Sequence, residues 1–130
     1  MMKVRPVVAV DYDETLVFSD GSANEQLISV LKNFRKKGGK LVLWTCRNDR
    51  QLHEAVVTCA EMGLFFDAVN ANVPESCYLY ETGYGSPKIF ANLYIDDRAQ
   101  GDLTQAYEKI DMLLNELIYN REMGEEIYDD

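Results

Sequence analysis

A continuous apolar run, Val7-Val8-Ala9-Val10, lies near the start of the chain and ends at the acidic stretch Asp11-Tyr12-Asp13. Because apolar residues fill consecutive positions instead of alternate ones, the run is typical of a strand buried on both faces. A strand of this kind requires a sheet with a layer of structure packed against each side. The run is too short to span a membrane or to serve as the apolar part of a secretory signal.

Short apolar segments and helical stripes alternate along the rest of the chain. The predicted strands cover residues 7–10, 41–44, 66–69 and 92–95. Apolar residues at helical spacing predict helices over residues 24–37, 49–62 and 102–119. Gly38-Gly39 and Gly63 are the expected stops of the first two helices, and Asp102 is the expected N-cap of the last.

This order of elements predicts an α/β fold, a three-layer open parallel sheet with helices on both faces. Crossovers between parallel strands in such folds are right-handed almost without exception. No repeat, low-complexity tract or linker divides the sequence, so we expect one domain over residues 1–121. The acidic residues 122–130 are expected to form a solvated or frayed tail.

Composition excludes several classes of protein. The 130 residues carry a formal net charge of −9, with 47% hydrophobic and 27% charged residues. That balance is typical of a soluble globular protein, and its negative sign argues against non-specific binding to nucleic acid. The three cysteines are an odd number in a chain with no export signal, so we expect reduced thiols and a cytoplasmic location. The single histidine, His53, cannot form a zinc site with these cysteines at a familiar spacing.

Polar residues gather directly after three of the predicted strands. They are Asp11-Tyr12-Asp13-Glu14-Thr15, Thr45-Cys46-Arg47-Asn48 and Asp96-Asp97-Arg98. In open parallel sheets, ligands bind outside the carboxyl ends of the strands. We therefore expect the three clusters to converge on one edge of the sheet and to form the functional site.

Two pairs of carboxylates within these clusters indicate a cation. Asp11 and Asp13 are two residues apart on chain leaving a strand, so their side chains can lie on the same side. Close carboxylates repel, and the pair requires either a proton or a divalent cation. The second pair, Asp96-Asp97, favours the cation over a chance surface pair or a helix cap. Carboxylate oxygens with few nitrogen or sulfur ligands suit Mg²⁺.

The same clusters resemble the motifs of the haloacid dehalogenase superfamily. Asp11-Tyr12-Asp13-Glu14-Thr15 is similar to its first motif, Asp-x-Asp-x-Thr after an apolar strand. Thr45 matches the second motif, Lys88 the third, and Asp96-Asp97 the fourth, all in the superfamily's order. Trp-Thr-Cys-Arg, Phe-Asp-Ala-Val-Asn and Lys-Ile-Phe-Ala-Asn-Leu-Tyr-Ile-Asp-Asp-Arg-Ala resemble a subgroup of small, capless, phosphatase-like proteins of phages and bacteria. The resemblance implies the Rossmannoid fold of that superfamily.

The resemblance also implies a role for each matching residue. Asp11 would attack phosphorus and form an aspartyl-phosphate. Asp13 would protonate the leaving oxygen and later take a proton from water. The Thr45 hydroxyl, the Cys46 backbone N–H and Lys88 would bind the transferring phosphoryl group.

The implied Mg²⁺ site draws on both acidic pairs. The Asp11 carboxylate, the Asp13 backbone carbonyl and the Asp96 carboxylate would hold the ion, and Asp97 would bind it through water or support one of its ligands. The sequence departs from the superfamily at Glu14, where glycine is frequent. Glu14 adds negative charge near a site for an anion, which puts ordinary turnover in question.

The residues beside the motifs allow more than one interpretation. Arg47, like Arg50, either contacts an anionic substrate or lies on a solvated helix face. Arg98 is expected to fix Asp97. Tyrosines 78, 80 and 84 could stack on a substrate, pack on a neighbouring subunit or cover the sheet edge.

Two short connections predict a site with no cap domain. Superfamily caps are inserted either between the first strand and its helix, here residues 14–23, or before the motif lysine, here residues 70–87. Neither segment is long enough for a domain, so the site is expected to be open. An open site suits a macromolecular phosphate end, or a small substrate enclosed by a neighbour in a homo-oligomer. The acidic charge favours a small phosphorylated metabolite, a sugar phosphate or nucleotide.

Two other functions compete with a magnesium-dependent phosphomonoester hydrolase. A signalling receiver domain also combines an acidic pair, a phosphorylated Asp, a Thr and a Lys, but there the acidic pair opens the domain. A catalytically inactive binding protein of the same fold would explain Glu14. All four motifs are present, however, which favours the enzyme.

Overall fold

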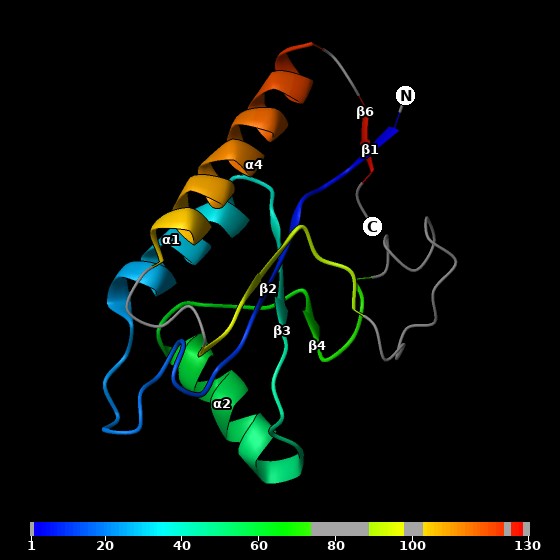
Figure 1. Cartoon of the computed structure of the whole chain (residues 1–130). Helices are drawn as coiled ribbons and strands as arrows, with labels where there is room; N and C mark the ends of the chain where they lie inside the picture. Colours follow the sequence, from blue (N-terminus) through cyan, green and yellow to red (C-terminus); the bar gives the residue numbers. More distant parts are fainter. Residues whose placement is uncertain (1, 74–88, 98–102, 124–125, 129–130) are drawn as a thin grey trace.

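Figure 1 shows the computed structural model of the chain, which describes residues 2–73, 89–97, 103–123 and 126–128. Its strands are β1 (Met2–Val4), β2 (Val7–Val10), β3 (Lys40–Leu43), β4 (Ala68–Val69), β5 (Leu93–Ile95) and β6 (Glu126–Tyr128). Its helices are α1 (Glu25–Lys36), α2 (Asp49–Glu61) and α4 (Thr104–Glu122). No helix in these described ranges is long and apolar enough to cross a membrane.

The main sheet is parallel and has the strand order β4-β3-β2-β5. The predicted open parallel sheet is therefore confirmed, with the apolar run β2 between two neighbours. The register places Val10 beside Leu43 of β3 and Ile95 of β5. Because these three strands end level with one another, the chain that follows each of them starts from the same edge of the sheet.

Both faces of β2 are buried, as its unbroken apolar run predicted. All four of its residues have no exposed surface. Val8 and Val10 belong to the cluster that contains the buried side chains of α1, α2 and α4. Val7 and Ala9 face the other way and pack with Val42, Ala68, Val73 and Ile89. The three described helices thus cover one face of the sheet, and residues 74–88, which follow Val73, lie outside the described part.

Helix α1 forms where the sequence predicted it, within one residue at each end. Its N-cap Asn24 accepts a hydrogen bond from the Leu27 N–H at 3.2 Å, which satisfies one of the first free amides of the helix. Its buried stripe consists of Leu27, Ile28, Leu31 and Phe34. Burying each such side chain contributes roughly 1.5–3 kcal/mol, so this stripe fixes the helix to the sheet. Gly38, at φ +113°, ends the helix in a conformation that favours glycine.

Of the other two helices, α2 agrees with its predicted range and α4 is shifted along the chain. Helix α2 begins at Asp49, ends at Glu61 and is followed by Gly63 at φ +80°, as predicted. Helix α4 begins later and ends later than the predicted range 102–119. Its N-cap is Leu103, which forms no side-chain cap bond, and the predicted cap Asp102 lies outside the described residues.

The outer strands β4 and β5 of the main sheet are shorter than predicted. At the start of each, a side-chain oxygen accepts a backbone hydrogen bond from the neighbouring strand. Asp67 precedes β4, and its Oδ2 accepts a hydrogen bond from the Leu41 N–H at 2.8 Å. Asn92 precedes β5 in the same way, with Oδ1 accepting from the Val7 N–H at 2.8 Å. The backbone N–H of each residue also donates to the same neighbouring strand, Asp67 to Leu41 O and Asn92 to Val7 O. Asp67 and Asn92 therefore remain hydrogen-bonded to the neighbouring strand although they lie outside β4 and β5.

A second, two-stranded sheet joins the two ends of the chain (Figure 1). Strand β1 pairs in parallel with β6, and Met2 lies beside Glu126. The prediction of a frayed tail is thus wrong for residues 126–128. Strand β1 immediately precedes β2, so this small sheet lies at the amino end of β2, away from the edge where the polar clusters begin.

Candidate active site

Backbone pairing continues one residue past the central strands and places the candidate residues. The Asp11 N–H donates to Ile95 O at 2.9 Å, and the Trp44 N–H donates to Val10 O at 2.9 Å. Asp11, Thr45 and Asp96 therefore begin at one edge, at the carboxyl ends of β2, β3 and β5. The predicted convergence of the three polar clusters is the arrangement that the strand register produces.

Asp11 is a partly buried carboxylate at the end of the central strand. Its Oδ1 accepts a hydrogen bond from the Tyr12 N–H at 2.7 Å. Burial raises the pKa of Asp11, the Tyr12 hydrogen bond opposes that rise, and the negative charges of Asp13, Asp97 and Asp96 add to it. The other three predicted acidic residues are thus close enough to Asp11 to influence its pKa. A cation bound at this site would offset the surrounding negative charge and favour the ionised form of Asp11.

The donor set fits Mg²⁺ although it does not form a cage of side chains. Within the ranges that the structure describes, no group of three or more His, Cys, Asp or Glu side chains is placed to hold a metal ion. Mg²⁺, however, is usually held by one or two carboxylates together with waters and substrate phosphate. The Asp11 and Asp96 carboxylates and the Asp13 main-chain carbonyl supply only oxygen donors, which is the chemistry that this ion prefers.

Asp13 is bound by Arg47 through a two-point ion pair. Arg47 Nε lies 2.9 Å from Asp13 Oδ2, and Arg47 Nη2 lies 2.8 Å from Asp13 Oδ1. These hydrogen bonds lower the pKa of Asp13. The Arg47 guanidinium carbon also lies 4.8 Å from the centroid of the Tyr12 ring. The sequence left Arg47 as a substrate contact or a solvated residue, and the structure places it against a predicted catalytic carboxylate.

Arg50 differs from Arg47. Its Nε lies 3.2 Å from Glu54 Oε1, four residues along α2, and its side chain is 91% exposed. This is the solvated helix face that the sequence offered as one of two interpretations.

Glu14 occupies a backbone position that favours glycine. Its φ is +59°, in the left-handed region that costs a residue with a Cβ atom about 1–2 kcal/mol. The turn is closed by the Glu14 N–H, which donates to Val17 O at 2.9 Å, and by the Leu16 N–H, which donates to Tyr12 O at 2.9 Å. Glycine, which is frequent at this position in the superfamily that the sequence resembles, would adopt this turn without that cost.

Thr45 is held from two sides. Its backbone N–H donates to Asn70 Oδ1 at 2.8 Å, and its Oγ1 accepts from the Arg47 N–H at 3.1 Å. Because the hydroxyl oxygen already accepts this bond, its hydrogen can point elsewhere. Cys46, the next residue, is exposed. These contacts fix the backbone and hydroxyl of the second motif.

Asn70 is a site residue that the sequence reasoning missed. It follows β4 at the same sheet edge, and its φ of +51° is one that Asn tolerates well. The signal was available, since Asn70 is the polar residue directly after the third predicted strand.

Some of the remaining predicted residues belong to the described part of the chain, and others do not. Asp96 is partly buried and Asp97 is exposed. Lys88, the predicted third motif, lies outside the described residues, as do Arg98 and the three tyrosines of segment 78–84.

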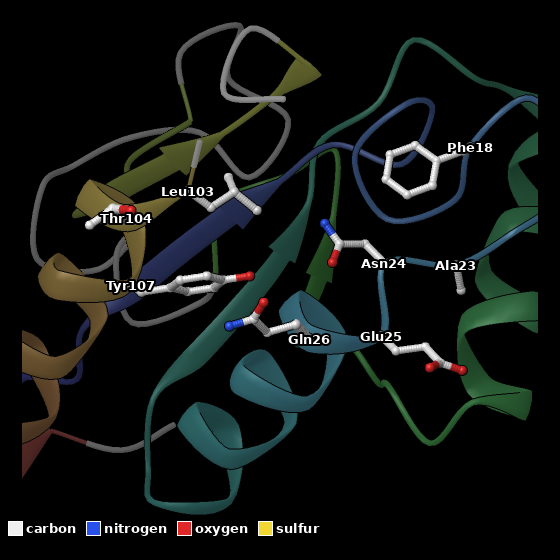
Figure 2. A pocket seen from close by; sticks show the side chains of 8 residues that line it. All are labelled: Phe18, Ala23, Asn24, Glu25, Gln26, Leu103, Thr104 and Tyr107. Carbon is white, nitrogen blue, oxygen red and sulfur yellow. The ribbon is translucent and has the colours of Figure 1, made fainter. Parts of the chain in front are cut away.

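A hollow of about 600 Å³, which none of these carboxylates lines, lies between the starts of α1 and α4 (Figure 2). Its lining residues are Phe18, Ala23, Asn24, Glu25, Gln26, Leu103, Thr104 and Tyr107. They include one carboxylate and neither lysine nor arginine, whereas phosphate recognition usually relies on cationic donors. The chemistry of the lining therefore does not make this hollow a second phosphate site.

Comparison with known proteins agrees with this geometry. A family model described as haloacid dehalogenase-like hydrolase matches residues 8–70. A solved structure, described as that of a conserved protein coded by a locus from Bacteroides thetaiotaomicron, is 34% identical, with a TM-score of 0.66. That match covers 82% of this chain and 89% of the other. None of the curated proteins matches the chain. The fold, the family model and this relative together show that the chain belongs to the haloacid dehalogenase-like hydrolases.

Proposed function

We propose that the protein is a magnesium-dependent phosphomonoester hydrolase that uses Asp11 as a covalent nucleophile. The observation that carries the proposal is the position of Asp11. It lies partly buried at the end of the central strand, within reach of the charges of Asp13, Asp96 and Asp97. Few roles other than catalysis or metal binding account for four carboxylates gathered at the carboxyl edge of a parallel sheet.

In the first step, an Asp11 carboxylate oxygen forms a bond to phosphorus. The bond between phosphorus and the leaving oxygen breaks, and that oxygen takes a proton from the Asp13 carboxyl group. In the second step, water attacks phosphorus and gives a proton back to Asp13, and the bond to Asp11 breaks. Inorganic phosphate leaves and both side chains return to their initial states. The Arg47 pair favours ionised Asp13, which is the form that the second step requires.

The phosphoryl group would be bound by the loop after β3. The Thr45 hydroxyl accepts a bond from the Arg47 N–H, so its own hydrogen is available to a phosphoryl oxygen. The exposed Cys46 is suited to present its backbone N–H to a second oxygen. Lys88 would neutralise charge on the phosphoryl group, a role that rests on the motif alone.

The Mg²⁺ ion would be held by the Asp11 carboxylate, the Asp13 main-chain carbonyl and the Asp96 carboxylate, with Asp97 as a ligand through water. When bound, it would offset the negative charge of these groups and of the phosphoryl oxygens.

We propose a small phosphorylated metabolite, a sugar phosphate or nucleotide, as the substrate. Residues 14–24, between Asp13 and α1, form a tight turn and a short loop with no inserted domain. The net charge of −9 disfavours a polyanionic macromolecule over a small ester. A second copy of the chain would enclose such a substrate if the protein is a homo-oligomer.

The test is turnover of p-nitrophenyl phosphate by the purified protein, with Mg²⁺ and with chelator. We expect release of nitrophenol that requires Mg²⁺ and falls by about 10³-fold or more in Asp11→Asn. Asp20→Asn is the matched control, because Asp20 is exposed and bonds only to Ser22 among the described residues. Full activity in Asp11→Asn, or no turnover of this ester or of a panel of sugar phosphates and nucleotides, would overturn the proposal.

A further inference from the structure

We propose that Trp44 stacks on the base of the substrate, so that the phosphoester hydrolysed is a nucleoside monophosphate. This inference rests on the proposed function, because it names the substrate class of the same site. The feature that carries it is a pair of exposed aromatic rings beside Asp11. The ring centroids of Trp44 and Tyr94 lie 5.5 Å apart, with an interplanar angle of 64°. Aromatic pairs favour this edge-to-face arrangement.

The register of the sheet places Trp44 next to the proposed nucleophile. Val10 at the end of β2 pairs with Leu43 at the end of β3. The residues that follow them are Asp11 and Trp44, and the Trp44 N–H donates to Val10 O at 2.9 Å. Trp44 is therefore the lateral neighbour of Asp11, at the spacing of adjacent strands, about 4.8 Å.

The two rings meet across the central strand, on the sheet face opposite the described helices. Val42 packs on that face, and alternation along β3 places Trp44, two residues later, on the same side. Tyr94 of β5 pairs with Ala9, which also packs on that face. Because β2 lies between β3 and β5, the contact between the rings passes over Ala9, whose methyl group leaves room for it.

Both rings are accessible to solvent, and one of them is anchored by hydrogen bonds. Trp44 is 41% exposed and Tyr94 is 45% exposed. The Tyr94 hydroxyl donates to Ile89 O and accepts from the Ala91 N–H at 3.1 Å. These bonds fix the tyrosine ring, which in turn supports one side of the indole. An indole held in this way loses little side-chain freedom when a ligand binds to its remaining surface.

The position of the indole selects a ligand with a spacer between phosphate and ring. Tyr94 is level with Ala9, two residues or about 7 Å before Asp11 along the strand direction. An indole in contact with Tyr94 therefore lies toward the amino end of the sheet, away from the phosphorus. A ring bonded directly to the ester oxygen would be too close to Asp11 to stack on it, whereas the ribose of a nucleotide supplies the spacer.

The charge around the site selects a neutral ring and a single phosphate. Every nucleobase has a flat π face that stacks on aromatic side chains. The negative charges of Asp13, Asp96 and Asp97 act on Asp11, which is beside the indole. They disfavour the additional phosphates of a nucleoside di- or triphosphate. A nucleoside monophosphate combines the ring, the spacer and the smallest charge.

The first experiment uses fluorescence, because Trp44 is the only tryptophan of the chain. Asp11→Asn protein with Mg²⁺, which binds esters without turnover, is titrated with the common ribonucleoside 5′-monophosphates and with ribose 5-phosphate, which lacks the base. Excitation at the red edge of indole absorption avoids absorption by the bases. We expect the nucleotides to quench the fluorescence to saturation. Ribose 5-phosphate should leave it nearly unchanged and should reverse the quenching by competition.

The second experiment compares kcat/KM for the best nucleotide, ribose 5-phosphate and p-nitrophenyl phosphate. Trp44→Leu should lower kcat/KM for the nucleotide by at least about fivefold, the effect of losing one stacked base, and should change the other two by less than about twofold. Trp44→Phe keeps a flat ring and should lose less. Phe65→Leu is the matched control and should resemble the wild type, because Phe65 is also exposed but precedes β4 at the amino end of the sheet.

Thermal melting of each variant checks that it is folded. Equal losses on all three esters in Trp44→Leu would assign the indole a structural role and overturn the inference. So would equal quenching by ribose 5-phosphate, turnover of ribose 5-phosphate but of no nucleotide, or the same selective loss in Phe18→Leu, which would place the base in the hollow between α1 and α4. These outcomes concern the leaving group alone and leave the proposed function intact. A wild-type protein without magnesium-dependent turnover of any ester would overturn both.

Discussion

Asn70 Oδ1 accepts a hydrogen bond from the Thr45 backbone N–H at 2.8 Å, and this bond joins the end of β4 to the loop that follows β3. The Asn70 N–H in turn donates to Leu43 O at 2.7 Å, so Asn70 binds β3 through its backbone and the loop after β3 through its side chain. The proposed phosphate-binding residue is therefore positioned by a strand that contributes no charged group to the site.

We predict that Asn70→Ala weakens both folding and catalysis. Loss of the acceptor leaves the partly buried Thr45 N–H without its bond, at a cost of about 1–3 kcal/mol in the free energy of unfolding. The positive φ adds about 1 kcal/mol for alanine. Displacement of Thr45 should lower kcat/KM by about tenfold or more. Urea denaturation and steady-state kinetics measure the two effects. Asn70→Asp, which keeps an acceptor and tolerates this φ, should retain most of the stability, and unchanged stability in Asn70→Ala would contradict the prediction.

The conformation of Glu14 leads to a second prediction. At φ +59° a β-branched residue is strongly disfavoured, so Glu14→Val should lower the free energy of unfolding by about 1–2 kcal/mol. Glu14→Gly removes the Cβ atom and so relieves the strain of this φ, but glycine also gives the unfolded chain more freedom, which offsets part of the stabilisation. Its free energy of unfolding should therefore match that of the wild type within about 1 kcal/mol. Glu14→Gln separates charge from backbone conformation, because it keeps the Cβ atom. If Glu14→Val is as stable as Glu14→Gly in urea denaturation, the backbone argument fails.

The parts of this fold that local pattern predicted are the ones that depend on local causes. The apolar run of β2 and the helical stripe of α1 need only neighbouring residues to specify them, and their predicted bounds were correct to within one residue. The pairing of β1 with β6 depends on two segments at opposite ends of the chain. Neither segment has enough residues to show an alternating pattern, so only the tertiary fold reveals their partnership.

The candidate site divides in the same way. The rule that ligands bind at the carboxyl ends of parallel strands was enough to bring Asp11, Thr45 and Asp96 together. The Arg47–Asp13 pair depends on a side-chain rotamer and on the offset between two loops, which spacing along the chain does not specify. Sequence therefore predicted which residues share the edge, and the structure was needed to show which of them touch.

The cysteines lead to a third prediction, which uses thiol reactivity. Cys59 is fully buried, and burial raises the pKa of its thiol to about 11. Roughly one such thiol in 10³ is ionised at pH 8, and thiolate is the reactive form. Cys46 is exposed beside Thr45. In a Cys77→Ala background, an aromatic disulfide reagent at pH 8 should therefore label Cys46 rapidly and Cys59 only after unfolding.

The label also tests the position of Cys46. A bulky adduct there should block phosphoryl binding, so labelling of the folded protein should abolish turnover, and inorganic phosphate with Mg²⁺ should slow the labelling. The Cys46→Ala variant, which keeps the backbone N–H, should stay active and resist the reagent. Rapid labelling of two thiols in the folded protein would contradict the burial of Cys59.

A fourth prediction concerns the stability of the metal-free protein as pH changes. Burial, together with the charges of Asp13, Asp97 and Asp96, raises the pKa of Asp11 above its ordinary value of 3.8. A carboxyl group whose pKa is raised on folding contributes stability while it is protonated, below its pKa in the unfolded chain. That contribution is lost as pH rises through the higher folded pKa, because the folded state then holds an unfavourable charge.

Asp11→Asn removes this charge and keeps an oxygen that can accept the Tyr12 N–H. In chelator, Asp11→Asn should therefore melt at a higher temperature than the wild type at pH 7, and the difference should shrink as pH approaches 3.8. Added Mg²⁺ should reverse the order at pH 7 by binding the wild type more tightly than the variant. A lower melting temperature for Asp11→Asn in chelator at pH 7 would show that the carboxylate stabilises the empty site, contrary to the repulsion inferred here.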